Sequence, residues 1–363
     1  MDSDVILVIV VATALAFDFT NGFHDTANVV ATSISTHAMP PRIAVAYAAI
    51  FNFAGAFISL AVAATVAKDV VNADVITPTV VYAGLVGAIA WNLATWYLGL
   101  PSSSSHALIG GVVGSAFAAS GADAVLADGV LGKVLIPAVL APVVAFVVGV
   151  IAINLVYGIV GRERPGLVNR GFRLGQVLSG GLLALAHGTN DAQKTMGVIT
   201  LALIANGNLS SDSNVPTWVV IAAASAISLG TYFGGWRIIR TMGTRIIKMD
   251  AAQGFSAQGA GAAVILASSH YGFPLSTTQV ISGGVMGVGA GKKLSAVRWG
   301  VAGNIVVAWL LTLPAAAAMG AAVYGFSNLF GNGAAGPVII TVLGIAGTGL
   351  AFARRLRQEP LPA

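Results

Sequence analysis

The stretch Pro-Ser-Ser-Ser-Ser-His-Ala-Leu-Ile-Gly-Gly at residues 101–111 returns at residues 274–284 as Pro-Leu-Ser-Thr-Thr-Gln-Val-Ile-Ser-Gly-Gly. Extended to residues 116 and 289, the two copies share six identical residues in sixteen positions. A hydroxyl-rich run inside an apolar chain is costly unless its donors face a partner. Two copies therefore indicate a duplicated membrane protein in which both halves contribute to one site.

The composition is that of a polytopic membrane protein. Hydrophobic residues make up 56% of the chain and charged residues only 9%, whereas soluble domains have about 25% charged residues. The absence of cysteine excludes disulfides, thiolate metal sites and cysteine nucleophiles. The N-terminal Met-Asp-Ser-Asp lacks the positive region of a cleaved signal peptide, so we expect the first apolar segment to be retained.

The positive charges predict how the chain is oriented in the plasma membrane. Fifteen of the eighteen Lys and Arg residues fall in five clusters: Arg42; Arg162, Arg164, Arg170 and Arg173; Arg237, Arg240, Arg245 and Lys248; Lys292, Lys293 and Arg298; and Arg354, Arg355 and Arg357. Because cytoplasmic loops are rich in Lys and Arg, we expect the C-terminus inside and the N-terminus outside. The net charge of +5 thus reflects contact with the lipid bilayer, and no nucleic acid partner is expected.

The apolar segments predict an all-α polytopic protein built from inverted-topology repeats, with broken helices and two re-entrant helical hairpins. One hairpin covers residues 79–119, turning at Pro101, and the other covers residues 251–290. An arm of such a hairpin is long enough to span the bilayer, so the alternative is that the arms cross the membrane completely. The predicted units are the first repeat (1–160), a short basic cytoplasmic linker (161–173), the second repeat (174–325), and a C-terminal transmembrane helix with a basic tail (326–363).

The duplicated motif predicts a binding site for an anion. Pro suits the first turn of a helix and Ser or Thr caps its N-terminus, where free N–H groups and the positive dipole end favour negative charge. The alternative is that the hydroxyls bond to helix carbonyls or help helices to pack. The candidate donors are Ser103, Ser104, Ser105, Ser276, Thr277 and Thr278.

The first apolar element of each half carries an aspartate near its middle: Asp25 in the first half and Asp191 in the second. Intramembrane carboxylates cost about 2.5–3.5 kcal/mol and mark ion or proton paths. Gly and Asn around each predict unwound backbone, whose carbonyls bind cations. The alternative for Asp191 is a structural pair with Lys194, and Asp18 is either a second relay group or a residue nearer the outer surface.

Three of the five histidines lie in these motifs: His24, His106 and His187. Histidine titrates near neutral pH and therefore suits proton coupling, although each of these residues is equally compatible with a structural hydrogen bond.

Together the motifs resemble the signature of the PiT inorganic phosphate transporters. That signature pairs Gly-x-Asn-Asp with Pro-x-Ser-(Ser/Thr)-(Ser/Thr)-(His/Gln) in each half. Residues 188–191 match it fully, and residues 22–25 match except that His24 replaces Asn. Both hairpin motifs match as well, and the resemblance extends over nearly all of residues 4–325.

The resemblance implies a secondary active symporter, not an enzyme, that takes up inorganic phosphate by alternating access and forms a homodimer. The His-Asp form of the first signature favours proton over sodium coupling, with His24, Asp25 and Asp191 as coupling groups. The two aspartates are also candidate ligands for a divalent metal carried with phosphate. The positions that match the family's binding residues are Asp25, Asn28, Ser103, Ser104, Ser105, Asn190, Asp191, Ser276, Thr277 and Thr278.

Other functions are compatible with parts of the pattern. Members of the same family include sodium-coupled phosphate symporters and sulfate permeases, and re-entrant hairpins also form passive anion channels. An intramembrane serine hydrolase is disfavoured, because Gln279 replaces His106 in the second copy and neither copy has a Gly-x-Ser-x-Gly turn.

Overall fold

The structure is a computed structural model that describes residues 2–331 and 333–358. The first helices are α1 (Asp2–Ser35), α2 (Pro41–Gly55), α3 (Ala61–Lys68), α4 (Pro78–Leu98), α5 (Ser104–Ser120), α6 (Ala127–Gly129) and α7 (Ile136–Val160). They are followed by α8 (Pro165–Ala205), α9 (Thr217–Phe233), α10 (Trp236–Arg240), α11 (Ala251–His270), α12 (Thr277–Lys292), α13 (Trp299–Asn328) and α14 (Ala335–Gln358). Since the described residues form no strand beyond one isolated bridge, the predicted all-α class is confirmed.

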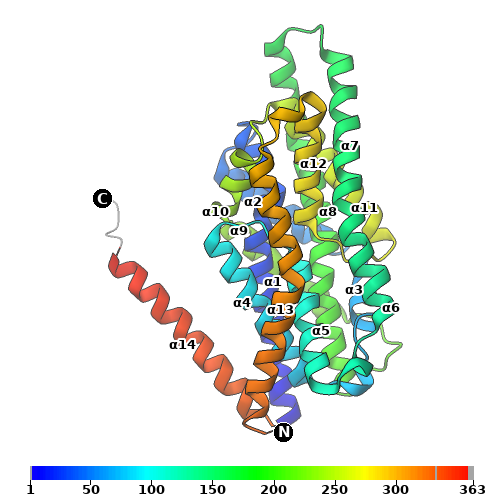
Figure 1. The fold of residues 1–363 in the computed structure, drawn as a ribbon, viewed down its shortest axis with the longest axis vertical. Helices are drawn as coiled ribbons and strands as arrows, with labels where there is room; N and C mark the ends of the chain where they lie inside the picture. The colour runs from blue at the N-terminus through cyan, green and yellow to red at the C-terminus, as the bar shows by residue number, and fades with distance from the viewer. Residues whose placement is uncertain (1, 332, 359–363) are drawn as a thin grey trace.

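Several helices are long and apolar enough to cross a membrane. Among the described residues they are Asp4–Ser35, Pro78–Leu98, Ala127–Val160 and Trp299–Asn328. A fifth crossing results if α9 is joined to the segment Trp236–Arg245, which is bent from it by 61°. The predicted polytopic membrane protein is therefore confirmed, with the long helices running along the longest axis of the molecule (Figure 1).

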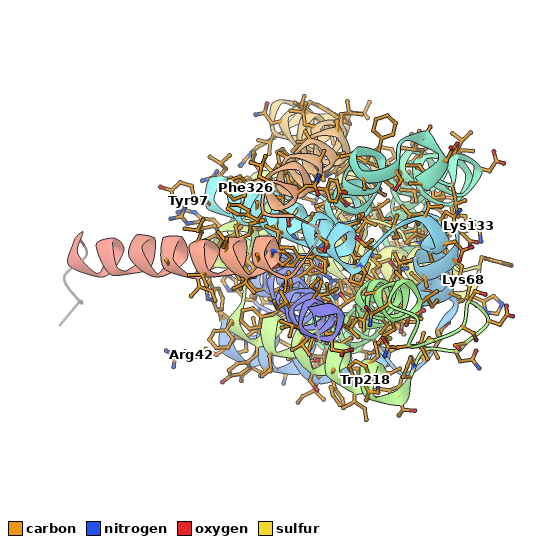
Figure 2. All side chains as sticks on the ribbon, turned by 90° about the horizontal axis from the view of Figure 1, so that it is seen from below. Arg42, Lys68, Tyr97, Lys133, Trp218 and Phe326 are labelled. Atoms are coloured by element: carbon orange, nitrogen blue, oxygen red, sulfur yellow. The ribbon has the colours of Figure 1, made fainter. Side chains whose placement is uncertain are left out.

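The outer surface is built for contact with lipid. Large apolar side chains on α7 and α13 face outward; Leu155 is 62% exposed and Leu311 is 52% exposed. Seen along the long axis in Figure 2, side chains including Trp218 and Phe326 lie around the edge of the helical body. Water would disfavour such a surface, whereas lipid chains solvate it.

Glycines of the two hairpin motifs bring backbones of the two predicted halves together. A Cβ atom added at Gly114 of α5 would lie 2.1 Å from the carbonyl oxygen of Ala317 in α13. A Cβ atom added at Gly287 of α12 would lie 2.2 Å from the carbonyl oxygen of Phe146 in α7. Each hairpin helix therefore packs on the long helix of the other half, at a distance that only glycine allows.

The helices that carry Asp25 and Asp191 are continuous, which corrects the prediction of unwound backbone there. Both α1 and α8 run unbroken through these positions. Gly22 serves close packing instead, because a Cβ atom there would lie 2.2 Å from the carbonyl oxygen of Ile227 in α9. The Thr26 hydroxyl bonds back to the Gly22 carbonyl at 2.7 Å, so this polar residue is satisfied within the helix.

Breaks occur at other places in the chain. Residues 56–60 separate α2 from α3, and residues 234–235 separate α9 from α10. Most of the predicted basic linker is helical, because α8 begins at Pro165, a residue suited to the first turn. Only residues 161–164 of that linker lie outside the helices.

The last helix, α14, is attached to the body near its N-terminal end. The Tyr82 hydroxyl donates to the carbonyl oxygen of Pro337 at 3.0 Å and lies 2.8 Å from the hydroxyl of Thr341. Beyond this contact α14 points away from the other helices (Figures 1 and 2). The end of the predicted basic tail, residues 359–363, lies outside the described residues.

Candidate functional site

The tips of the two hairpins meet inside the molecule. The Ser105 hydroxyl in the first turn of α5 donates to the carbonyl oxygen of Leu275, in the other tip, at 3.0 Å. In Figure 1, α5 lies in the lower part of the body and α12 in the upper part. Because both helices begin at this contact, their N-terminal N–H groups and positive dipole ends converge. The contact predicted from the duplicated motif is thus present.

Two of the candidate hydroxyls form the N-caps of these helices. The Ser103 hydroxyl accepts a hydrogen bond from the backbone N–H of His106 at 3.1 Å. The Ser276 hydroxyl accepts one from the backbone N–H of Gln279 at 3.3 Å. Matching caps fix where each helix starts, so these serines orient the residues that follow them.

Asp25 on α1 is surrounded by neutral donors and one histidine. The Ser104 hydroxyl donates to Oδ2 of Asp25 at 2.5 Å, and the Thr278 hydroxyl donates to Oδ1 at 3.3 Å. Nδ1 of His24 lies 2.6 Å from Oδ1. Both hairpin tips therefore contact this carboxylate, which is 1% exposed.

Asp191 on α8 has a full positive charge beside it. Nζ of Lys194 donates to Oδ1 of Asp191 at 2.5 Å, as the alternative structural pairing predicts. The Thr277 hydroxyl donates to Oδ2 at 3.1 Å, and Nε2 of His187 lies 3.1 Å from the same oxygen. All four side chains are at most 1% exposed, so the cluster is closed to both sides of the molecule.

The two candidate asparagines are used differently. The side-chain amide of Asn28 donates to the hydroxyl of Thr278 at 2.9 Å, which places it in the cluster. The amide of Asn190 instead donates to the hydroxyl of Ser269 at 2.8 Å and to the carbonyl oxygen of Phe273 at 3.1 Å. It thereby anchors the end of α11 instead of joining the hydroxyls of the tips.

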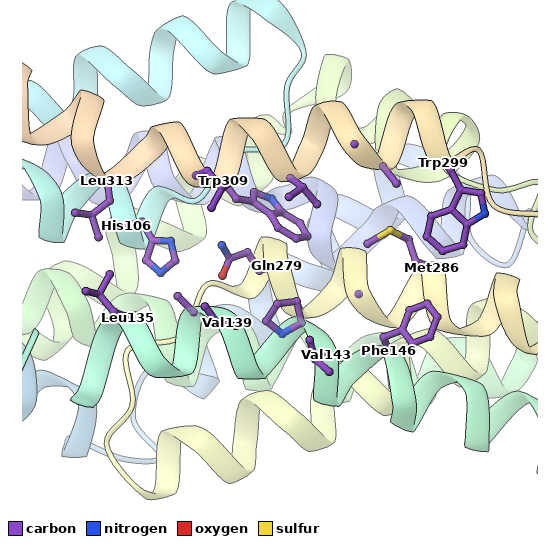
Figure 3. Close-up of a pocket in the computed structure, with 17 residues that line it drawn as sticks. His106, Leu135, Val139, Val143, Phe146, Gln279, Met286, Trp299, Trp309 and Leu313 are labelled. Carbon is purple, nitrogen blue, oxygen red and sulfur yellow. The ribbon is translucent and has the colours of Figure 1, made fainter. Parts of the chain in front are cut away.

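A separate cavity of about 760 Å³ lies between α7 and α13 (Figure 3). Its walls are mainly apolar, and His106 and Gln279, the matching residues of the two motifs, provide its polar groups at the inner side. His106 therefore faces this cavity instead of the carboxylates. The apolar lining suits hydrocarbon and not a charged ion.

Three further buried residues lie in or near the cluster. Lys194 is one of them, and a lysine within an apolar span is itself a signal of function. His187, at the i−4 position from Asp191, contributes a second basic group to the cluster. Asp18 is fully buried beside Asn21 and Thr195 and lies near Asp191 and Lys194.

Asp25, His187 and Asp191 also form a potential metal site. Ligand atoms of Asp25, His187 and Asp191 all lie within 4.8 Å of one another. Two carboxylates and an imidazole in this range suit a divalent cation with bonds of about 2.0–2.6 Å. The predicted pair of Asp25 and Asp191 is thus brought together, with His187 as an additional ligand.

Apolar spanning helices around a buried polar cluster define a membrane transport protein. Residues 21–320 match the model of the phosphate transporter family. The chain belongs to this family, so the resemblance to the PiT phosphate transporters is confirmed.

Relatives support the assignment over most of the chain. A "Probable low-affinity inorganic phosphate transporter" of Mycobacterium leprae is 55% identical over 329 residues, covering 90% of this chain and 79% of the relative. A protein of Bacillus subtilis with the same name is 45% identical over 327 residues, covering 90% and 98%. A solved structure titled "The sodium-dependent phosphate transporter" has a TM-score of 0.82 at 24% identity, covering 89% of this chain and 99% of that one. At this identity it supports the fold alone.

Proposed function

We propose that this chain is a secondary active symporter that imports inorganic phosphate across the plasma membrane together with protons. The observation that carries the proposal is the closed cluster in which hydroxyls of both hairpin tips meet Asp25 and Asp191. Hydroxyls and helix N-termini suit an anion, whereas carboxylates suit a cargo that carries its own protons. The family assignment identifies phosphate as that cargo.

The carboxylates favour phosphate over sulfate. Phosphate near neutral pH carries one or two O–H groups, which donate to Asp25 or Asp191, whereas sulfate has only acceptor oxygens. Sulfate would leave Oδ2 of Asp25 unpaired once Ser104 turns to the anion, at a cost of about 1–3 kcal/mol, whereas Asp191 keeps its pair with Lys194. This corresponds to roughly tenfold to hundredfold selection for phosphate.

The substrate-binding groups in this proposal come from both halves. The proposed ligands of phosphate are the hydroxyls of Ser104, Ser105, Thr277 and Thr278 and the amide of Asn28. On loading, the hydroxyls turn to phosphate from the oxygen atoms of Asp25, Asp191 and Leu275 to which they donate in this structure. Ser103 and Ser276 hold the helix ends in place as caps, and Asn190 positions the end of α11.

Proton coupling is supported by the surroundings of Asp25. Among the described residues, His24 is the only basic side chain at hydrogen-bonding distance from this carboxylate. In the proposal His24 and Asp25 hold the transported proton, because an imidazole nitrogen and a carboxylate oxygen at this distance can share one. Asp191 contributes a second carboxylate to the proposed path. A sodium-coupled cycle is the alternative, with an exchangeable cation near Asp25.

Alternating access is the proposed mechanism. The cluster is closed to both sides, so the helices must move before substrate can enter or leave. Reciprocal packing of α5 on α13 and of α12 on α7 supports two inverted repeats, at residues 1–160 and 174–325, that move relative to one another. The proposed orientation has the N-terminus outside and the C-terminus inside, and the resemblance implies a homodimer.

A divalent cation is a second proposed cargo. The grouping of Asp25, His187 and Asp191 suits such an ion, whose charge would neutralise part of the phosphate charge. In this variant the transported species is a metal–phosphate complex.

Uptake by purified protein in proteoliposomes tests the proposal. Labelled phosphate and sulfate are offered under imposed proton or sodium gradients, with and without a divalent metal. We expect phosphate to accumulate against its gradient and the accumulation to collapse on addition of a protonophore. Uptake driven only by sodium would overturn the proposed proton coupling. Equal uptake of sulfate would overturn the proposed selectivity for phosphate. Equilibration without accumulation would indicate a passive channel.

A further inference from the structure

Lys194 is the most unusual buried residue of the site. Its side chain is 1% exposed and extends from α8 into the junction of the two hairpin tips. An ammonium group is costly in such surroundings unless it is fully paired. Its presence within the cluster therefore needs a specific explanation.

Three oxygen atoms surround the ammonium. Nζ of Lys194 donates to Oδ1 of Asp191 at 2.5 Å, to the hydroxyl of Ser105 at 2.5 Å and to the carbonyl oxygen of Leu275 at 2.7 Å. All three of its N–H donors are thus used. Leu275 lies in the non-helical tip before α12, so its carbonyl is not part of a helical ladder.

The first half has no charge at the matching position. Lys194 follows Asp191 by three residues, and Asn28 follows Asp25 by three residues. Both side chains reach hydroxyls of the opposite hairpin: Asn28 donates to Thr278, and Lys194 donates to Ser105. The positions are therefore structurally related, but only the second one carries a cation.

The oxygen set around Lys194 is also that of a site for a hard monovalent cation. A carboxylate, a hydroxyl and a backbone carbonyl from a non-helical segment are oxygen ligands of the kind that bind Na⁺ in transporters with broken helices. An ammonium group and a sodium ion have the same charge, and both bind oxygen atoms. The covalent ammonium thus stands where a free ion could bind.

We propose that Lys194 fills a monovalent-cation site formed by Asp191, Ser105 and the Leu275 carbonyl, and makes that site independent of sodium. The tethered charge neutralises Asp191 and links the tips of both halves at all times. This inference rests on the proposed symport function, because it specifies which coupling ion the second half does not need. Replacing Lys194 by a short neutral residue opens the site to Na⁺.

Lys194→Asn tests the proposal, since it gives the second half the residue found in the first. The purified variant is heated in detergent in sodium chloride and in choline chloride at equal ionic strength. We expect a saturable rise of the melting temperature of about 2–4 °C or more at about 100 mM sodium. The original chain and Lys133→Asn, which removes a lysine from an exposed pair with Asp69, should melt equally in both salts.

A second control removes the carboxylate as well. Lys194→Asn combined with Asp191→Asn should show no sodium-dependent rise, because the charged ligand of the site is gone. Lys194→Gln, with a longer neutral side chain, serves if Lys194→Asn is not recovered as a monodisperse protein. Recovery of either variant in sodium chloride but not in choline chloride supports the proposal. If neither variant is recovered in sodium chloride or in choline chloride, the proposal is overturned.

Uptake gives an independent result. In proteoliposomes, phosphate uptake by Lys194→Asn should require sodium, whereas uptake by the original chain should not. Equal melting of Lys194→Asn in both salts would overturn the inference, as would an equal sodium effect on the original chain. If the original chain transports no phosphate, the proposed function fails instead, and the melting comparison still decides whether the cation site exists.

Discussion

The carboxylates of the two halves both lie at the hairpin tips but have different partners. Asp25 contacts the hydroxyls of Ser104 and Thr278 and the ring of His24, none of which carries a permanent charge. Asp191 is paired with Lys194, whose Nζ lies 2.5 Å from Oδ1 of Asp191. The duplicated framework therefore gives one carboxylate a lysine partner and the other only hydroxyls and a histidine.

The largest expected difference between the two regions follows from removing each carboxylate. Asp191→Asn leaves the Lys194 ammonium buried without its counter-charge and should destabilise the protein by about 3–5 kcal/mol. Asp25→Asn removes no permanent ion pair and should cost about 1–3 kcal/mol. Both variants should lose concentrative phosphate uptake. Thermal unfolding of the two variants in detergent and uptake in proteoliposomes measure these effects.

A double substitution separates the ion pair from the carboxylate itself. Asp191→Asn combined with Lys194→Met should recover most of the lost stability, because no unpaired charge remains. Uptake should stay absent, since a coupling group is missing. If Asp25→Asn and Asp191→Asn are equally stable, the ion pair of Asp191 with Lys194 contributes no more to stability than the hydrogen bonds of Asp25, and the contrast between the two halves is wrong.

The threonines of the second hairpin give a smaller and more selective contrast. Thr278→Val removes a donor to Asp25 and an acceptor for Asn28, so uptake should fall about tenfold to hundredfold. Thr277→Val should have a weaker effect, because Asp191 keeps Lys194 and His187. Initial rates over a range of phosphate concentrations measure both. A larger loss of uptake for Thr277→Val would mean that Asp191 depends on its hydroxyl partner more than Asp25 does.

Packing, unlike charge, should be equal in the two halves. Gly114→Ala and Gly287→Ala each bring a methyl group against a backbone carbonyl, so each should lower stability by about 1–3 kcal/mol. Gly303→Ala, where a Cβ atom meets nothing within 4 Å, is the matched control and should be neutral. Thermal unfolding detects these differences. A loss confined to one half would mean that the crossings are not equivalent.

The smallest expected effect concerns the helix caps. Ser103→Ala and Ser276→Ala should each destabilise by about 1 kcal/mol and lower uptake by less than about tenfold. The measurement is the same pair of assays, with Ser104→Ala as the comparison that loses a direct contact with Asp25. If Ser103→Ala impairs uptake as strongly as Ser104→Ala, the cap serine also binds substrate.

Some features of this protein are determined by local sequence. Apolar segments, the Pro-Ser and Pro-Leu-Ser starts of α5 and α12, and the repeated glycines depend on spacing alone, so they predict helices, caps and close crossings. The two aspartates are conspicuous in an apolar chain for the same reason. The family signature adds the expectation that these segments meet.

Other features depend on which side chains the tertiary structure brings together. Gly22 and Asn28 suggested an unwound helix, but the neighbouring α9 accounts for the glycine and Thr278 binds the asparagine. Likewise, the identity of the partners of Lys194 could not be read from its i+3 spacing, because Ser105 is 89 positions away in sequence. Hydrogen bonds and charges act through space, so only the folded chain decides which acid is paired with a lysine and which is surrounded by hydroxyls and a histidine.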